Sequence, residues 1–226
     1  MAEPRVAVRV WDAWVRLFHW GAVACVAVSY VSAQREAWAV HYASGYTLLA
    51  LLLFRVGWGL AGSENARFAG FVRSPLAALR ELARFPLREV DTGTTHNPAG
   101  GWMVLLLFAL LLAQAVSGLF TNHDVGFTYS AHGPLANAVA EGTSEWFSSL
   151  HRRIIDVLLI AIGVHVVAVL AYAAVKRQDL VRPMLTGVKR LPPAAAHAPR
   201  HAPPLRALAL LAAAAAAVWG ITRIGA

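Results

Sequence analysis

Long runs of apolar residues, separated by polar or proline-rich stretches, organise this sequence. Four runs lie at about 15–32, 40–62, 98–121 and 146–175. Each reaches or exceeds the ~18 residues that a helix needs to cross a bilayer core about 30 Å thick. Because that core offers backbone groups no water to bind, we expect each run to be a transmembrane helix. The pattern predicts an all-α fold, an integral membrane four-helix bundle.

A fifth, weaker apolar run lies near the C-terminal end of the sequence. It covers about 205–222 and consists largely of alanine. The Pro/Ala-rich stretch at 191–204 before it predicts an extended linker. We therefore expect a transmembrane domain at 1–190, a linker at 191–204 and a fifth transmembrane helix at 205–226. A helix lying on the membrane surface remains the alternative for this last segment.

The composition excludes several other classes of protein. Hydrophobic residues make up 58% of the 226 positions and charged residues only 14%, whereas soluble domains carry roughly 25% charged residues. The single cysteine, Cys25, can form neither an internal disulfide nor the Cys-x-x-Cys-His attachment site of a c-type haem. Any haem in this protein is therefore held without covalent thioether bonds.

The net charge of +8 is explained by topology rather than by nucleic-acid binding, because the segments between charges are lipid-like. Most Lys and Arg residues lie before the first run, in the 63–97 loop and in the 176–204 segment. By the positive-inside rule these segments face the cytoplasm. We expect a multi-pass protein of the bacterial inner membrane with a cytoplasmic N-terminus. A cleaved signal peptide at 1–33 is the alternative.

Four of the nine histidines lie in or at the ends of the apolar runs, and they are His19, His41, His151 and His165. Ionisable residues inside a membrane are costly, so they are candidates for function. His151 and His165 are 14 positions apart, which is about 3.9 helical turns or about 21 Å. One helix therefore presents two histidines on one face at two depths.

The direction of each helix then pairs the histidines by depth. His41 is expected at the depth of His151 near the outer side, and His19 at the depth of His165 near the inner side. Two non-covalent haem b groups, each held between two histidines, would use all four residues as metal ligands. One zinc ion could not, because its ligands lie only ~2 Å from the metal. A proton path or a metal-transport path remains open.

Arginines near these histidines fit the propionate groups of haem, which need cationic partners at the membrane edge. The candidate cofactor-binding arginines are Arg16, Arg55, Arg152 and Arg153. For Arg16 and the Arg152–Arg153 pair, the alternative is a side chain that reaches from the helix to the membrane interface.

Several segments together resemble one known family. They are Val10-Trp11-Asp12, Arg16-Leu17-Phe18-His19-Trp20, His41-Tyr42-Ala43-Ser44-Gly45-Tyr46, Leu53-Phe54-Arg55-Val56-Gly57-Trp58-Gly59 and His96-Asn97-Pro98-Ala99-Gly100. With the His151–His165 spacing, they resemble the prokaryotic cytochrome b561 family, which includes the b-type cytochrome subunits of nickel-iron hydrogenases. The resemblance covers about 8–190 and leaves 205–226 without a counterpart.

The resemblance implies a four-helix diheme cytochrome b that transfers electrons between the quinone pool and a protein or small-molecule redox partner. It also implies that His19, His41, His151 and His165 are the haem ligands, and that quinone is the substrate of a quinol-linked oxidoreductase. Acidic residues in the outer loop favour a basic partner such as a c-type cytochrome, although an ordinary solvated loop explains them equally well. Two alternatives stay open: the membrane anchor and electron conduit of a hydrogenase-like complex, and a histidine-based proton or metal transporter.

Overall fold

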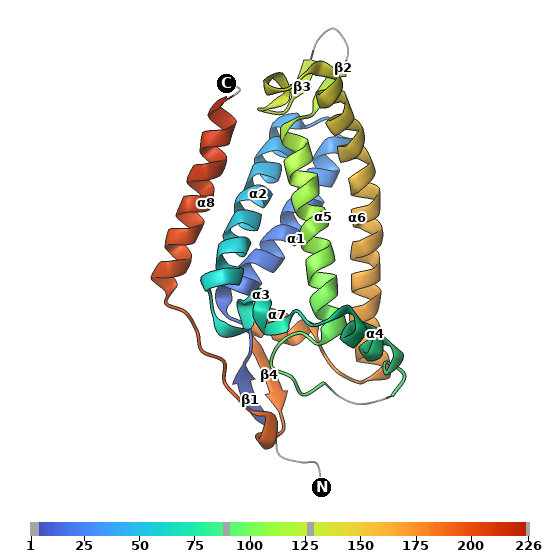
Figure 1. The fold of residues 1–226 in the computed structure, drawn as a ribbon, viewed down its shortest axis with the longest axis vertical. Coiled ribbons are helices and arrows are strands. Elements are labelled where there is room, and N and C mark those ends of the chain that lie inside the picture. The colour runs from blue at the N-terminus through green and yellow to red at the C-terminus, as the bar shows by residue number, and fades with distance from the viewer. Residues whose placement is uncertain (1–4, 88–90, 126–128, 225–226) are drawn as a thin grey trace. The chain divides into compact units, whose positions relative to one another are not determined.

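A computed structural model describes residues 5–87, 91–125 and 129–224 of the chain. Five of its helices are long and apolar enough to cross a membrane, which confirms the predicted helical membrane protein (Figure 1). In chain order the elements are β1 (Val6–Arg9), α1 (Ala13–Gln34), α2 (Trp38–Ala61), η1 (Glu64–Ala66), α3 (Phe68–Phe71), α4 (Pro75–Ala83), α5 (Pro98–Leu119), β2 (Asn122–Val125), β3 (Tyr129–His132), η3 (Ala136–Ala138), α6 (Glu141–Val175), α7 (Val181–Thr186), β4 (Val188–Leu191), η4 (Pro193–Ala195) and α8 (Pro204–Ile224).

The candidate spans α1, α2, α5 and α6 coincide with the four apolar runs to within a few residues, except at the start of α6. That helix begins at Glu141, ahead of the apolar stretch, because its polar first turns attach to the segment that follows α5. The Ser144 hydroxyl donates to the Phe120 carbonyl at 2.8 Å, and the Ser148 hydroxyl donates to the Asn122 carbonyl at 3.0 Å. Hydropathy marks only the part of a helix that lies in lipid, so it misses these turns.

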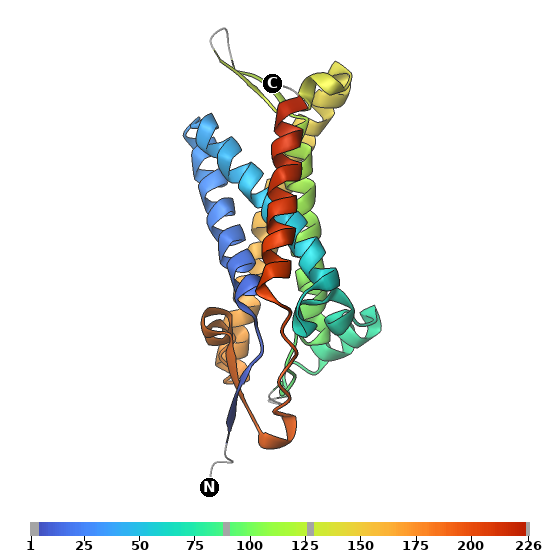
Figure 2. The ribbon, with the colours of Figure 1, turned by 90° about the vertical axis from the view of Figure 1, so that its left-hand side faces the viewer.

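The fifth apolar run forms α8, a helix of 21 residues. At 1.5 Å per residue this is about 31 Å, enough to cross a bilayer core. The expected linker at 191–204 is less uniform than its proline content indicates. Leu191 ends strand β4 and Pro193–Ala195 forms η4, and Figure 2 shows an extended segment from there to the start of α8.

Two of the long helices begin at side-chain caps. Asn97 Oδ1 accepts a hydrogen bond from the backbone N–H of Gly100 at 2.7 Å, in the first turn of α5. At α1, Asp12 Oδ1 accepts from the N–H of Val15 at 2.7 Å. These caps satisfy backbone donors that the first turn of a helix leaves without partners.

The chain divides into two compact units. The first unit comprises residues 1–17, 56–107 and 161–207, and the second comprises 18–55, 108–160 and 208–226. Each is described by itself below.

In the first unit, β1 pairs with β4 in antiparallel register, from Val6 opposite Leu191 to Arg9 opposite Val188. Figure 1 shows the two strands side by side. Gly187, just before β4, has a φ of 82°, and its carbonyl accepts a hydrogen bond from the Val10 N–H at 2.8 Å. The sequence predicts no strands here, because four-residue strands have too few positions to produce a visible alternation.

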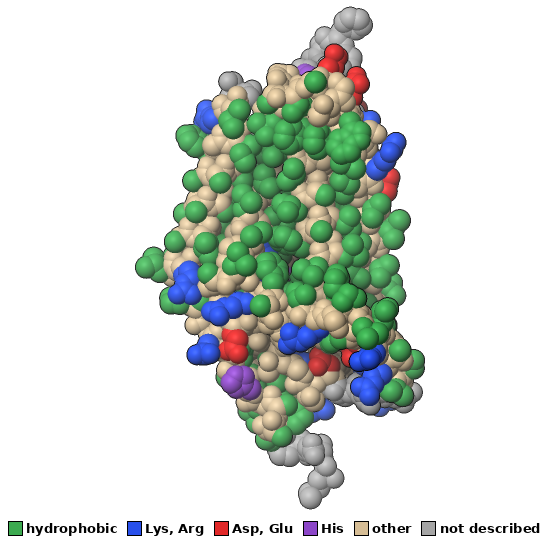
Figure 3. Space-filling model, in the orientation of Figure 1, with side chains coloured by type: hydrophobic (Ala, Val, Ile, Leu, Met, Phe, Trp, Pro, Cys, Tyr) green, Lys and Arg blue, Asp and Glu red, His purple; other side chains and the backbone are tan. Residues whose placement is uncertain are grey.

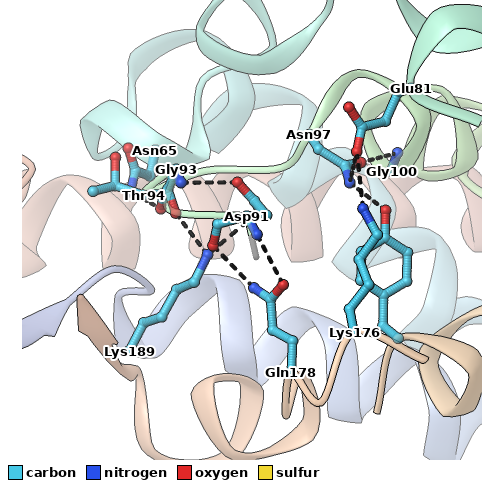
Figure 4. A network of polar contacts seen from close by, with 11 residues as sticks. Asn65, Glu81, Asp91, Gly93, Thr94, Asn97, Gly100, Lys176, Gln178 and Lys189 are labelled. Carbon is cyan, nitrogen blue, oxygen red and sulfur yellow. Dashed lines mark hydrogen bonds and ion pairs between the residues drawn. The ribbon is translucent and has the colours of Figure 1, made fainter. Parts of the chain in front are cut away.

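Polar side chains join the loop after α4 to the segment after α6, also within the first unit (Figure 4). The Gln178 amide donates to the Asp91 carbonyl at 3.1 Å, and Lys189 Nζ lies 3.4 Å from Asp91 Oδ2. Nearby, the Asn97 amide donates to the Tyr172 hydroxyl at 2.6 Å. These bonds connect the loop between α4 and α5 to the end of α6 and to the segment after it.

In the second unit, apolar side chains of α1, α2 and α5 pack together. One cluster is built around Ala22, Cys25, Leu48 and Leu52. Cys25 is buried there as a free thiol and packs with its apolar neighbours. A second cluster contains Leu49, Leu119 and Val218, so α8 packs on this unit through its own apolar side chains.

Candidate functional site

Two of the four membrane histidines face each other in the second unit. His41 lies in the first turns of α2 and His151 in α6. Their ring centroids are 6.3 Å apart and their planes meet at 82°. Pairing of His41 with His151 is therefore present in the structure as the helix directions predicted.

Hydrogen bonds fix the orientation of both rings. Because a carbonyl oxygen only accepts, Nδ1 of His41 donates to the Ser29 carbonyl at 2.9 Å, and Nδ1 of His151 donates to the Gln114 carbonyl at 3.0 Å. Protonation at Nδ1 leaves the lone pair on Nε2, which is the form of imidazole that binds a metal. The Gln114 side-chain amide donates to Nε2 of His151 at 3.0 Å, so a metal at that nitrogen would replace this bond.

The separation of the rings suits one metal ion between them. A metal–imidazole bond is about 2 Å long and a ring centroid lies about 1 Å beyond its nitrogen, so imidazoles on opposite sides of one ion have centroids about 6 Å apart. The observed 6.3 Å agrees with this value. The two histidines would therefore supply two nitrogen ligands to one metal ion, such as haem iron.

Both histidines line a cavity of about 290 Å³, just below the roughly 300–1,000 Å³ typical of ligand pockets. Its walls come from α1, α2, α5 and α6 and are mostly apolar, with Tyr42, Tyr46 and Arg152 among the polar members. Two glycines leave room around the rings. A Cβ on Gly45 would meet nothing within 4 Å, whereas a Cβ on Gly118 would lie 3.0 Å from Cε1 of His151. The residues present therefore fit a flat, apolar cofactor such as haem.

The candidate arginines have different environments. Arg152 lines the cavity, and Arg153 follows it on α6 with an exposed side chain. Arg55 is buried, with its guanidinium carbon 6.0 Å from the centroid of the Phe18 ring. In the first unit, Arg16 donates to two backbone carbonyls, those of Leu185 at 2.6 Å and Asp12 at 3.3 Å. Only Arg152 is thus brought beside the paired histidines.

His19 and His165 are both half-buried, His19 on α1 and His165 on α6. They belong to different units of the chain, and their pairing stays a prediction. The Trp20 ring lies against that of His19, with centroids 4.9 Å apart.

Sequence reasoning missed the groups that hold the rings of the histidine pair. Gln114 contacts both nitrogens of His151, and the Ser117 hydroxyl lies 3.1 Å from its Nδ1. The signal was present, because both residues are polar side chains within the apolar run at 98–121. The Ser29 carbonyl carries no side-chain signal at all.

In residues 5–87, 91–125 and 129–224, no group of three or more His, Cys, Asp or Glu side chains lies close enough together to hold a metal ion. A haem needs only two protein ligands, because the porphyrin supplies the other four.

Comparison with known proteins gives one family and one relative. The family model described as prokaryotic cytochrome b561 matches residues 10–187. A probable Ni/Fe-hydrogenase B-type cytochrome subunit of Rhizobium leguminosarum bv. viciae is 26% identical over 161 residues. That alignment covers 66% of this chain and 66% of the relative. No solved structure matches the chain.

Proposed function

Because the chain belongs to the prokaryotic cytochrome b561 family and is a membrane haem-b electron-transfer protein, we propose that it carries electrons between membrane quinone and a redox partner. The proposal includes two haem b groups, each held by two histidines. The family match contains all four candidate ligands, since it runs from residue 10 to residue 187.

The observation that carries the proposal is the facing pair of His41 and His151 in an apolar cavity. These residues would hold one haem through their Nε2 atoms. The Ser29 and Gln114 carbonyls keep each ring in the metal-binding tautomer and limit its rotation. Arg152 is the residue best situated to pair with a propionate, because it lines the same cavity.

Haem supplies one-electron redox chemistry when it is bound, and the protein tunes that chemistry through ligands, burial and nearby charge. The apolar walls of the cavity limit access of water to the iron. Neutral imidazoles add no charge to the site, so Arg152 would stabilise the reduced state relative to a site without a cation. These are the contributions that this chain makes to the potential.

For a second haem, the proposal rests on the sequence positions of His19 and His165. Their place in the apolar runs and the 14-residue spacing between His151 and His165 support it. Arg16 and Arg55 stay candidates for its propionates. The distribution of basic residues supports an inner-membrane protein with a cytoplasmic N-terminus.

A second candidate function is that of a membrane anchor and electron conduit in a hydrogenase-like complex. The relative from Rhizobium leguminosarum, a probable Ni/Fe-hydrogenase B-type cytochrome subunit, favours it. The two functions differ in one measurable respect. A free-standing cytochrome purifies without other subunits, whereas a conduit purifies together with its redox subunit.

The first experiment is a reduced-minus-oxidised spectrum with pyridine-haemochrome quantitation of the purified protein. We expect about two b haems per chain. His41→Ala and His151→Ala should each lose the same single haem, because each would remove one of its two protein ligands. His19→Ala and His165→Ala should lose the other.

The matched control is His197→Ala, which changes an exposed histidine near η4 and should leave both haems in place. Full haem content in the His41 and His151 variants would contradict the assignment. A folded protein without haem, purified from haem-replete cells, would favour the transporter alternative instead.

A further inference from the structure

A second cavity, of about 280 Å³, lies in the first unit between the end of α2 and the segment that leads into α8. Its lining contains Arg67, Arg200 and Arg206 together with His201 and Glu64. Arg200, His201 and Arg206 lie after residue 187, so they are outside the part of the chain that matches the family. Figure 3 shows basic side chains gathered at the start of α8.

The chain builds this cavity through contacts across more than 130 sequence positions. The Glu64 N–H donates to the Arg200 carbonyl at 3.0 Å, and the Arg200 N–H donates to Glu64 Oε2 at 3.0 Å. The Ala202 N–H donates to the Ser63 hydroxyl at 3.1 Å. These bonds hold the segment before α8 against the loop after α2.

The arginines keep donors available for a ligand. Arg67 uses its Nε on the Gly62 carbonyl at 3.0 Å, and Arg206 uses one terminal nitrogen on the Ala61 carbonyl at 2.8 Å. The Arg200 side chain is 96% exposed, and its Nε lies 3.8 Å from Glu64 Oε2. With three arginines against one carboxylate, these side chains give the lining two net positive charges. A phosphate group suits such a lining, because arginine binds phosphate oxygens through paired donors.

The position of the cavity favours a lipid as the source of the phosphate. Ala61 ends one candidate membrane span and Pro204 begins another, so the cavity lies at a membrane interface. Two leucines beside it, Leu60 and Leu205, are 70% and 76% exposed and offer apolar surface for acyl chains. Basic pockets between transmembrane helices bind anionic head groups in this way.

We propose that this cavity binds the phosphate group of an anionic phospholipid. The lipid would bridge the end of α2 and the start of α8 at the membrane interface. The proposal is independent of haem binding, because none of its residues lines the cavity of His41 and His151.

The test is native mass spectrometry of the haem-loaded protein in detergent, titrated with phosphatidylglycerol, with zwitterionic phosphatidylcholine and with inorganic phosphate. We expect one phosphatidylglycerol to be retained per chain, in preference to phosphatidylcholine. The triple variant R67Q/R200Q/R206Q should weaken this binding at least about tenfold, because each basic residue near a membrane surface contributes to attraction of anionic lipid. The control R80Q/R84Q/R182Q removes the same charge from exposed positions outside the cavity and should retain the lipid.

Equal retention of phosphatidylglycerol in the two triple variants would overturn the proposal. Displacement of the lipid by an equal concentration of inorganic phosphate would also overturn it, since the site would then bind free phosphate. The haem spectrum reports folding in each variant. If the cavity triple variant fails to fold, lipid retention is measured in the single variant R200Q instead. This variant keeps the hydrogen bond from the backbone N–H of residue 200 to Glu64, and the side chain that it changes caps no helix. Unchanged lipid retention in folded R200Q would then refute the proposal.

Discussion

At the scale of single residues, backbone carbonyls orient the two rings of the histidine pair. The positions of His41 and His151 follow from helix direction and membrane depth, both of which hydropathy determines. The hydrogen bond from His41 to the Ser29 carbonyl depends on how α1 and α2 pack, and every residue has a carbonyl. Sequence reasoning therefore finds ligands by side-chain type, while the backbone carbonyls that orient them appear only in the fold.

The buried carboxylate of Asp12 accepts two hydrogen bonds. It caps α1 at Val15 and accepts a hydrogen bond from Nε1 of Trp58 at 3.0 Å. We expect Asp12→Ala to lower the free energy of unfolding by about 2–4 kcal/mol. The variant loses the cap at Val15 and the hydrogen bond that the Trp58 indole N–H donates. Thermal unfolding of the purified protein measures this. Asp179→Ala, which removes an exposed cap, should cost about 1 kcal/mol or less, and an equal loss in both variants would refute the burial argument.

Glu64 gives a prediction for the dependence of stability on pH. The backbone N–H of Arg200 and the nearby charges of Arg200, His197 and Arg67 lower the pKa of this carboxyl, against a smaller opposing effect of desolvation. A group whose pKa is lowered by folding stabilises the protein above its unfolded pKa, and loses that effect as the pH falls through the folded pKa. We expect acid to release the segment before α8.

Limited proteolysis of that segment between about pH 7 and pH 3 tests the prediction, since unfolded glutamate titrates near ~4.3. The wild type should become more susceptible as the pH falls, and Glu64→Gln should already be susceptible at neutral pH. Glu145→Gln, an exposed glutamate of α6, serves as the control and should follow the wild type. Identical cleavage of the wild type and Glu64→Gln at pH 7 would contradict the role of the Glu64 carboxylate in holding this segment.

At the scale of elements, the long helices were predictable because the bilayer sets their length. Their apolar runs are the strongest pattern in the sequence, and α8 is visible despite its alanine content. The strands β1 and β4 are four residues each and lie just outside the matched region, one before it and one after it. Their pairing depends on tertiary structure, so local pattern gives no indication of it.

Gly187 connects α7 to β4 in a conformation that suits glycine. Its φ of 82° is in the left-handed region, and an added Cβ would lie 2.6 Å from the Trp11 carbonyl. We expect Gly187→Ala to lower the free energy of unfolding by at least about 1–2 kcal/mol, the cost of left-handed backbone for a residue with a Cβ. Hydrogen exchange at β1 should rise together with the loss of thermal stability.

The comparison for this variant is Gly142→Ala in the first turn of α6, where an added Cβ meets nothing within 4 Å. That substitution should be neutral or stabilise by up to about 1 kcal/mol. If both alanine variants unfold at the same temperature, backbone conformation at Gly187 is not limiting.

At the scale of the whole molecule, the family match and the cavity of the histidine pair both lie before residue 188. Helix α8 contributes Val218 to the apolar cluster that contains Leu49 and Leu119. The arginine-lined cavity lies at the start of the same helix. The sequence distinguished this segment by its lack of a counterpart in the family. The sequence does not indicate that the Pro/Ala-rich stretch before α8 is hydrogen-bonded to the loop after α2.

A chain that ends after Ala196 tests this division. We expect it to keep the haem held by His41 and His151, because no residue after 158 lines their cavity. Its haem should be released at a lower temperature, since loss of Val218 uncovers Leu49 and Leu119. Haem per chain and the temperature of haem release measure the two effects. Complete loss of haem would show that α8 belongs to the electron-transfer core.

The pairing of β1 with β4 also has a consequence for the order of events during synthesis. Val6 finds its partner only when Leu191 has been made. At the usual 5–20 residues per second, β1 emerges roughly 10–40 s before that partner exists. During this interval its backbone groups must be satisfied by water or by another protein. The two strands can therefore pair only late in synthesis, after the ribosome has made the segments that form α1, α2, α5 and α6.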